Sequence, residues 1–481
     1  MNRKSYCRDL AKKNGESPVI EKLEMIHYFS YVTPLLNGTE TLYMSRYLAQ
    51  ISKWGTDRIY KKTERFLLRP IVEKTALDVA AQVLSDVKEF GDKALIDCIR
   101  RFDKSDMSIR RLRITPKEIA EAKRSVDDAF KVAAEDTLKR VIAFSERGLR
   151  DDWSMPTPHG GELGERFIAY DRIGAYIPGG AAPLASTALM TLTLAKVAGV
   201  KELVACSPAN AKGELNPYIL YALDLAGATE IYKMGGIQAI GAMAYGTKTV
   251  KKVRKIVGPG GPYVTAAKRL VYGDVALDMV AGPSEIAILC DSTANPSHIA
   301  ADLLSQAEHG TGSERALLVT TSQKMAKAVR VEVLNQAKTL SRSEPIKHVL
   351  EKGMLLVVVK NMVDGIKLCN KFAPEHMELI VTSPEKWIEK ITNVGALFIG
   401  EWTPESVGDF VAGPSHVLPT GGSAAYFSGL TVEDFRRRIS LLKFTKADLE
   451  ETLPTIEAFG RVETLDGHAR SATIRFETQQ D

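Results

Sequence analysis

Cysteine is scarce in this chain of 481 residues. The five cysteines are odd in number and none forms a C-x-x-C pair, which disfavours a disulfide framework and a cysteine-based zinc site. This usage is typical of a reducing compartment, so we expect a cytoplasmic protein. The N-terminal segment MNRKSYCRDLAKKNGE has no apolar run, and we expect no signal peptide.

Long basic blocks and long uninterrupted apolar runs are also missing. The net charge of +5 comes from 64 basic and 59 acidic side chains that are spread along the sequence, so nucleic acid is not an expected partner. The uncharged stretch from Ile173 to Ala195 is interrupted by Pro178, Gly179 and Pro183. It predicts a buried strand, a turn and a helix, and we expect no membrane span.

The standard nucleotide-binding fingerprints G-x-G-x-x-G and G-x-x-x-x-G-K-[ST] are absent. Glycine-rich turns nevertheless follow apolar segments at Pro178–Gly180, Gly235–Gly236 and Gly258–Gly261. A doubly wound sheet binds ligands at such carboxyl ends of strands. Plain strand-to-helix turns also contain paired glycines, so this pattern leaves dinucleotide binding open.

Strand-like and helix-like segments alternate over most of the chain. Helical periodicity begins near Lys74 and again after Thr115, an expected N-cap with Pro116 at the first helical position. Short apolar runs predict strands at RIGAYIP, ELVACSP, EIYKMGG, KIVGPGG, SEIAILCD, ALLVTTS and MLLVVV. The alternation predicts parallel sheets with helical crossovers in two α/β halves. The tail is expected to be mainly helical and to end in a strand at SATIRFE.

One motif, D-x-V-A-G-P-S, occurs twice. The copies begin at Asp278 and Asp409 and have the same internal spacing. Two related halves would explain the match. A shared tight turn built by Gly-Pro-Ser would explain it equally well.

Four of the eight histidines lie beside carboxylates or amides in the C-terminal part of the chain. Imidazole, amide and carboxylate groups are donors that zinc accepts. Gln306 and His309 are three residues apart on a predicted helix that starts at Asn295, so they share one face and would reach one metal ion. Asp409 and His468 would complete four-coordinate binding. Alternatives remain: an ordinary polar helix end, or ligands drawn from Glu308, Asp466 and His416.

A second pair, Glu375 and His376, places an acid and a base side by side after Pro374. In an extended segment neighbouring side chains diverge, so these two would serve different steps: one to take a proton and the other to activate water. The alternative is an exposed loop dipeptide without chemistry.

Together these motifs resemble those of the histidinol dehydrogenase family, zinc enzymes that oxidise L-histidinol to L-histidine in two NAD-linked steps at the end of histidine biosynthesis. The resemblance runs from about Lys62 to Phe476. It is carried by AYIPGGAAPLAST, MGGIQAIGAMAYGT, KIVGPGG, DMVAGPSE, LLSQAEHG, FAPEHMELI, GDFVAGPSHVLPTGG and DGHAR.

The resemblance implies a role for each matching residue. Zinc ligands fall on Gln306, His309, Asp409 and His468, and the catalytic pair falls on Glu375 and His376. Substrate contacts fall on Ser186, Ser284, His416 and Glu463. Cofactor contacts fall on Tyr176, Gln238 and Gly261, where the family commonly has asparagine. The resemblance further implies a homodimer in which the C-terminal tail completes the partner's site.

The expected fold is α/β, with two incomplete Rossmann-like parallel-sheet domains and small helical domains from the termini. We expect residues 1–60 to be an extension of unknown role. The first α/β domain is expected to combine 61–175 with 284–425, the second to span 176–283, and the helical tail to span 426–481.

Three other functions fit parts of the sequence. A paralogous zinc- and NAD-dependent dehydrogenase would act on another small polar alcohol, such as a sulfonated diol. A metal-binding homologue without turnover would not need Glu375 and His376. Metal-assisted hydrolysis would leave the glycine-rich turns unexplained. Intact Ser186 and Glu463 favour histidinol, because a carboxylate suits a cationic amine or imidazole.

Overall fold

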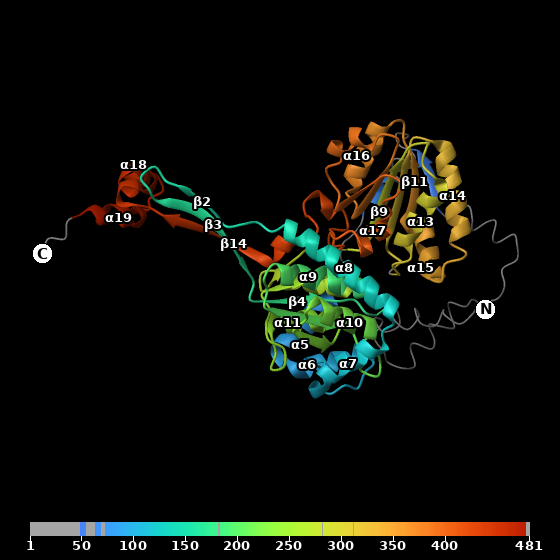
Figure 1. Cartoon of the computed structure of the whole chain (residues 1–481), viewed down its shortest axis with the longest axis horizontal. Helices are drawn as coiled ribbons and strands as arrows, with labels where there is room; N and C mark the ends of the chain where they lie inside the picture. Colours follow the sequence, from blue (N-terminus) through green and yellow to red (C-terminus); the bar gives the residue numbers. More distant parts are fainter. Residues whose placement is uncertain are drawn as a thin grey trace, which may run out of the picture. The chain divides into compact units, whose positions relative to one another are not determined.

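The computed structural model describes residues 49–53, 63–68, 73–180, 183–280, 282–310 and 312–477. Most of the expected extension over residues 1–60 lies outside these ranges. Residues from Ala49 onward form one compact unit that contains three sheets among its described residues. Figure 1 shows helices lying along the two larger sheets.

The first sheet has six parallel strands in the order β1-β11-β10-β9-β12-β13. Their bounds are β1 (Gln50–Lys53), β9 (Glu285–Cys290), β10 (Arg315–Thr320), β11 (Met354–Val358), β12 (His376–Ile380) and β13 (Ala396–Ile399). The central strand β9 is buried along its whole length, as expected of an apolar run covered on both faces. The edge strand β1 comes from the range expected to be an accessory extension, so that range contributes to this sheet.

The second sheet has five parallel strands in the order β6-β5-β4-β7-β8. Their bounds are β4 (Arg172–Tyr176), β5 (Glu202–Ser207), β6 (Glu230–Lys233), β7 (Lys255–Val257) and β8 (Ala276–Leu277). When the strands of each sheet are numbered in chain order from β9 and from β4, both sheets have the Rossmann-like order third-second-first-fourth-fifth. The six-stranded sheet has β1 as an additional strand at one edge. The expectation of two Rossmann-like parallel-sheet domains is confirmed.

The repeated motif occupies corresponding places in the two domains. Asp278 directly follows β8, and Asp409 lies in the short helix α17 (Glu405–Phe410), which follows β13. Each copy therefore comes after the fifth strand of its sheet. The common strand order favours two related halves over a shared turn as the explanation of the repeat.

Helices cover both sheets. Those beside the six-stranded sheet are α13 (Pro296–Ala307), α14 (Gln323–Gln336), α15 (Ser343–His348) and α16 (Met362–Phe372). Those beside the five-stranded sheet include α9 (Ala185–Val197), α10 (Pro217–Ala226), α11 (Gly236–Tyr245) and α12 (Pro262–Val271). Thr115 and Asn295 are N-caps, as expected, and each accepts a hydrogen bond from the backbone of the following turn.

The division between the two domains differs from the expected one. The helices expected to join the first domain are α5 (Lys74–Phe90), α6 (Asp92–Cys98), α7 (Pro116–Ser125) and α8 (Asp128–Arg147). They contact α9 to α12 of the five-stranded domain instead. A boundary at 176 also separates the central strand β4 from its own sheet. Periodicity shows which helix face is buried, and it does not show which sheet covers that face.

The C-terminal tail is not wholly helical. It contains β14 (Arg436–Lys443), which pairs antiparallel with β3 (Glu162–Ala169), and β3 pairs with β2 (Trp153–Pro156). The helices α18 (Lys446–Val462) and α19 (Asp466–Thr473) follow, and Figure 1 shows them at one end of this sheet. The expected strand at 471–477 is instead helical, with a 3-10 turn over Ile474–Phe476. Strand β14 forms by pairing with β3, which is far away in the sequence. The local sequence pattern does not show such a pairing.

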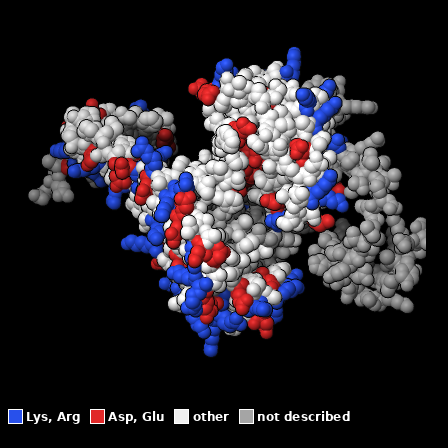
Figure 2. Space-filling model, turned by 45° about the vertical axis from the view of Figure 1, so that its right-hand side comes forward, with Lys and Arg blue, Asp and Glu red and all other residues white. Residues whose placement is uncertain are grey.

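No helix within the described ranges combines the length and apolar character needed to cross a membrane. On the face shown in Figure 2, acidic side chains lie among the basic ones, so the small positive excess is spread out. The cysteines that the structure describes, Cys98, Cys206, Cys290 and Cys369, are free and buried.

Candidate metal centre and active site

The candidate centre lies at the amino edge of the six-stranded sheet. Helix α13 follows β9 and runs back along the sheet, so its C-terminal end returns to the edge where β9 and β12 begin. Gln306 and His309 stand at this end of the helix. His376 is the first residue of β12, and it pairs with Ile286 of β9. A right-handed crossover helix thus brings its last turn to the first residues of the strands.

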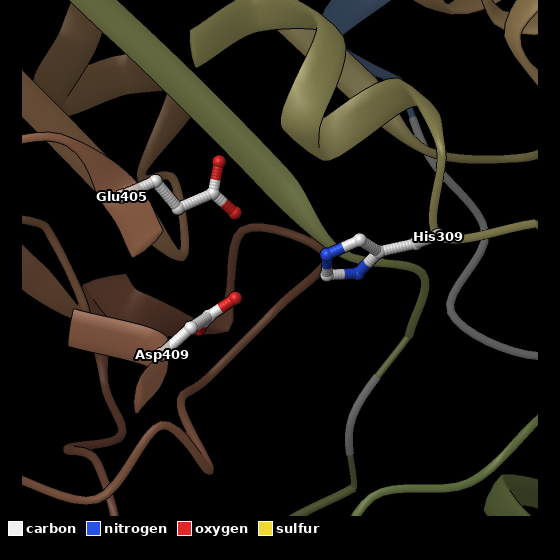
Figure 3. Close-up of side chains that lie close together, drawn as sticks. All are labelled: His309, Glu405 and Asp409. Atoms are coloured by element: carbon white, nitrogen blue, oxygen red, sulfur yellow. The ribbon is translucent and has the colours of Figure 1, made fainter. Parts of the chain in front are cut away.

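Two acidic side chains from α17 face His309. Glu405 and Asp409 are four residues apart, so they share one face of the helix. One ligand atom from each of His309, Glu405 and Asp409 lies within 4.8 Å of the other two. Figure 3 shows the imidazole directed toward the two carboxylates. Residues almost a hundred positions apart therefore converge on one place.

The amide of Gln306 also belongs to this cluster. Its hydrogen bonding is satisfied when the nitrogen donates to the Glu285 carbonyl at 3.1 Å and to Glu405 Oε1 at 3.0 Å. In the opposite orientation the amide oxygen would face these acceptors. In the satisfied orientation the oxygen lies 3.5 Å from His309 Nδ1. Two donors to one tetrahedral zinc ion lie about 3.3 Å apart when each bond is about 2.0 Å long. The donor set and this spacing fit a zinc ion.

Glu375 and His376 are both buried, so the reading of an exposed loop dipeptide is wrong. Glu375 Oε2 accepts a hydrogen bond from the backbone of Glu285 at 3.0 Å, and the Ser284 side chain bonds to the same carboxyl group. His376 Nε2 instead faces Asp409 Oδ1 at 3.8 Å. Both groups also contact the Glu285 backbone, Glu375 at the nitrogen and His376 at the carbonyl, and Glu375 Oε2 lies 3.8 Å from His376 Nδ1.

Burial controls protonation in this centre. It raises the pKa of Glu375 well above its usual value, and the nearby Asp409 adds to the effect. Burial also lowers the pKa of His376 to about 4, against the opposing effect of Asp409. His376 is therefore neutral at neutral pH and able to accept a proton.

Candidate substrate contacts from the two domains meet beside this centre. His416 Nδ1 lies 3.0 Å from the Asp409 carbonyl, and its Nε2 lies 3.0 Å from the Thr187 hydroxyl. Thr187 is next to Ser186 in the first turn of α9. Ser186 is thus next in sequence to a residue that contacts His416, and Ser284 contacts Glu375.

Two expected site residues are not part of this cluster. Glu463 and His468 are exposed, at the end of α18 and in α19. Among the described residues, the group of possible metal ligands at His309 does not include His468. Within one chain, the expected fourth ligand is not brought to the other three.

The expected cofactor residues lie on the five-stranded domain. Tyr176 ends β4, and its hydroxyl accepts a hydrogen bond from Gly236 at 3.2 Å. Gln238 follows in the first turn of α11, and Gly261 caps α12. The strand order reverses between β4 and β7, and ligands of doubly wound sheets bind at that point.

Two observations fit a ligand at this edge. The buried Gln238 Nε2 has no hydrogen-bond partner among the described residues. Gly258, directly after β7, has φ +108°, and a Cβ atom there would lie 2.2 Å from the Tyr176 carbonyl oxygen. The two strand ends therefore approach closely, and a buried amide beside them has an unused donor.

Sequence reasoning missed three buried or partly buried acidic residues, Glu405, Glu378 and Asp302. Glu405 is almost fully buried, and its backbone nitrogen donates to Glu378 Oε1 at 3.0 Å. Glu378 in turn hydrogen bonds with Asp302, and burial raises the pKa of both carboxyl groups. The spacing of four residues between Glu405 and Asp409 was the available signal, because it predicts one helix face.

The fold and this cluster define a protein of two Rossmann-like domains with a group of nitrogen and oxygen donors that could hold a metal ion. The sequence model of the histidinol dehydrogenase family matches residues 69–476. Histidinol dehydrogenase of Heliobacterium mobile is 40% identical over 84% of this chain and 96% of its own length. That of Bacillus subtilis is 42% identical over 82% of this chain and 91% of its own.

A solved structure agrees with these relatives. The crystal structure of histidinol dehydrogenase from Elizabethkingia anophelis matches with a TM-score of 0.83 and 36% identity, covering 89% of this chain and 97% of that one. The chain belongs to the histidinol dehydrogenase family.

Proposed function

We propose that this chain oxidises L-histidinol to L-histidine through L-histidinal, using zinc and two molecules of NAD. The supporting observation is the convergence of Gln306, His309 and Asp409 beside the buried pair Glu375 and His376. In a member of this family, that arrangement provides metal donors and an acid–base pair within one small volume.

Gln306, His309 and Asp409 would hold the metal from one chain, with His468 as the fourth ligand. A bound zinc ion supplies a fixed point for the imidazole and amine of histidinol, and so holds the carbinol carbon in place. Glu463 would contact the cationic part of the substrate, while Ser186, Ser284 and His416 would fix its orientation.

Tyr176, Gln238 and the backbone at Gly261 would hold NAD, which supplies a hydride acceptor for each oxidation. The unpartnered amide of Gln238 and the close approach of Gly258 to Tyr176 support this assignment. At Gly261 the chain lacks the amide side chain common in the family. NAD binding there would depend on backbone groups or water.

His376 and Glu375 would move the protons. Neutral His376 accepts the hydroxyl proton at Nε2, the ring nitrogen that faces Asp409. Glu375 then takes a proton from the water that adds to the aldehyde carbon, and the aldehyde oxygen takes the proton held by His376, which forms the hydrate for the second oxidation. The low exposure of both side chains would exclude bulk water and retain the aldehyde between the steps.

The active unit would be a homodimer in which the tail of each chain completes the partner's site. Supporting this, α18 and the turns that flank α19 expose apolar side chains that a partner would cover. They are Phe459, Val462, Leu465 and Ile474, with exposed fractions of 61%, 76%, 40% and 48%. Association would also bring the remote His468 and Glu463 to a metal centre.

The direct test is NADH absorbance with purified protein, zinc, NAD and L-histidinol. Two equivalents of NADH per histidinol are expected, with histidine as the product. A sulfonated diol supplied in place of histidinol serves as the control for the paralogous alcohol dehydrogenase. No NADH from histidinol at high enzyme concentration would refute the proposal.

A further inference from the structure

We infer that Glu405 is a positioning residue that orients the Gln306 amide, so that its oxygen and not its nitrogen faces the metal. The inference rests on the proposed function, because it takes Gln306 to be a metal ligand. Glu405 itself is assigned no contact with substrate or cofactor.

The two ends of a glutamine amide are alike in shape and opposite in chemistry. The oxygen carries lone pairs that a cation accepts, whereas the nitrogen carries two hydrogens and offers none. A glutamine therefore ligates a metal only when something holds the amide in the correct orientation. Side chains that orient metal ligands in this way influence affinity strongly.

Glu405 and the Glu285 carbonyl provide that constraint. They lie 3.0 Å and 3.1 Å from the amide nitrogen of Gln306, and each accepts one of its hydrogens. The amide oxygen then lies on the side of His309, 3.5 Å from Nδ1. Since both nitrogen hydrogens are used, a rotated amide would lose both of these hydrogen bonds. It would set its oxygen against the Glu285 carbonyl and Glu405, with His376 Nδ1 as its donor at 3.2 Å.

The Glu405 carboxylate is itself held in place. Its Oε2 accepts a hydrogen bond from the Ser305 hydroxyl at 2.8 Å, and its backbone nitrogen donates to Glu378 Oε1 at 3.0 Å. The residue is only 1% exposed. Ser305 and Gln306 are consecutive on α13, so one carboxylate bridges neighbouring side chains of that helix.

Glu405 also lies near enough to His309 and Asp409 to be a ligand itself. Its two oxygens, however, are each engaged by a donor, Oε1 by Gln306 and Oε2 by Ser305. Each oxygen keeps a further lone pair, so these bonds do not by themselves exclude a ligand role. The contact between Oε1 and the Gln306 nitrogen is the observation that assigns Glu405 its action through Gln306.

The test is a double-mutant cycle on zinc affinity, measured by competition with a chelator on the full chain. Glu405→Met removes both acceptor oxygens at similar length, and Gln306→Ala removes the amide. Each single variant is expected to weaken zinc binding about 10- to 100-fold. The double variant is expected to bind zinc no more weakly than Gln306→Ala, because without the amide Glu405 has nothing to orient.

Three results are distinguishable. Wild-type affinity in Glu405→Met, with weakened binding in Gln306→Ala, overturns the inference alone. Additive losses in the double variant also overturn it, because they make Glu405 an independent ligand. Wild-type affinity in Gln306→Ala overturns the ligand set of the proposed function and this inference with it.

Two further variants guard against a folding defect. Glu405→Gln keeps one acceptor toward Gln306 and is expected to lose less affinity than Glu405→Met. Glu401→Met is the matched control, since this exposed carboxylate on the same segment pairs with His298. Its zinc affinity is expected to equal that of the wild type. Circular dichroism melting of each variant without zinc establishes that the chain is folded.

Discussion

His376 Nε2 lies 3.8 Å from Asp409 Oδ1, so a buried imidazole from β12 faces a candidate metal ligand from α17. The other ring nitrogen, Nδ1, lies 3.2 Å from the Glu285 carbonyl and is the natural site of the ring proton. The free nitrogen then faces the metal donors. A substrate held there would present its hydroxyl group to Nε2.

Replacing His376 by asparagine should therefore remove the proton acceptor and leave the metal donors in place. We expect kcat for histidinol oxidation to fall by about 10²- to 10⁴-fold, the usual contribution of a general base. NADH formation and zinc content per chain are the two measurements. Unchanged turnover would show that another group accepts the proton.

Replacing Glu375 by glutamine should affect the second oxidation more than the first. An amide does not take a proton from water, so hydration of the aldehyde should slow by about 10²-fold or more. In a rapid-mixing single turnover, we expect one equivalent of NADH to form quickly and the second slowly. Ser284→Ala, which removes a neighbouring hydroxyl, is the comparison. Two equally fast equivalents in Glu375→Gln would be evidence against its role.

Two inactive variants should restore activity to each other if the tail of one chain completes the active site of its partner. His309→Ala disables the body of a chain and His468→Ala disables its tail, so each homodimer is inactive. A mixed dimer contains one intact site, and random association should restore roughly a quarter of wild-type activity. Co-expression with two affinity tags isolates the mixed dimer. If His468 serves its own chain, the mixed dimer has no activity.

An asparagine at position 261 should tighten NAD binding. Gly261 has φ −66°, which any residue adopts, and no atom lies within 4 Å of the position a Cβ atom would take. One added hydrogen bond of about 1 kcal/mol would lower the KM for NAD about fivefold. Gly261→Ala fills the same space without an amide and should leave KM unchanged. Equal values for both variants would exclude an amide contact.

The ion pair between Arg172 and Glu230 should make stability depend on acid pH. Hydrogen bonds from Arg172 lower the pKa of Glu230 to about 2, below its unfolded value of 4.5. A lowered folded pKa adds stability above pH 4.5 that is lost as pH falls toward 2. Glu230→Gln should cost about 1–3 kcal/mol at pH 7, from lost charged hydrogen bonds.

Urea unfolding of the wild type and Glu230→Gln at several pH values tests this dependence. The difference in unfolding free energy should shrink over the acid range and be smallest near pH 2. Glu202→Gln is the control, because Glu202 contacts the same arginine from a more exposed position. A difference that stays constant with pH would mean that the pKa of Glu230 is not lowered.

The local sequence pattern was sufficient to predict most of the helices and parallel strands. Thr115 and Asn295 were predictable as N-caps because capping depends on neighbouring residues alone. The antiparallel strand β14 and the helical end at 471–477 were not predictable in this way. Strand pairing depends on a partner far away in the sequence, and the short segment at 471–477 suits either state.

The candidate site was only partly visible from sequence. Gln306 and His309 lie on one helix, so their spacing alone predicts a shared face. Asp409 was one of several possible further ligands, and the resemblance selected it. Glu405 was missed because nothing in the sequence shows that α17 lies against the end of α13.

The sequence by itself determined the family, the α/β class and the residue types available for metal binding and proton transfer. These properties depend on local composition and on motifs that keep their order along the chain. Tertiary structure alone decided that Glu405 bonds to Gln306, that burial shifts the pKa values of Glu375 and His376, and that His468 lies apart from the other ligands. Distances and burial arise only when segments remote in sequence are brought together by the fold.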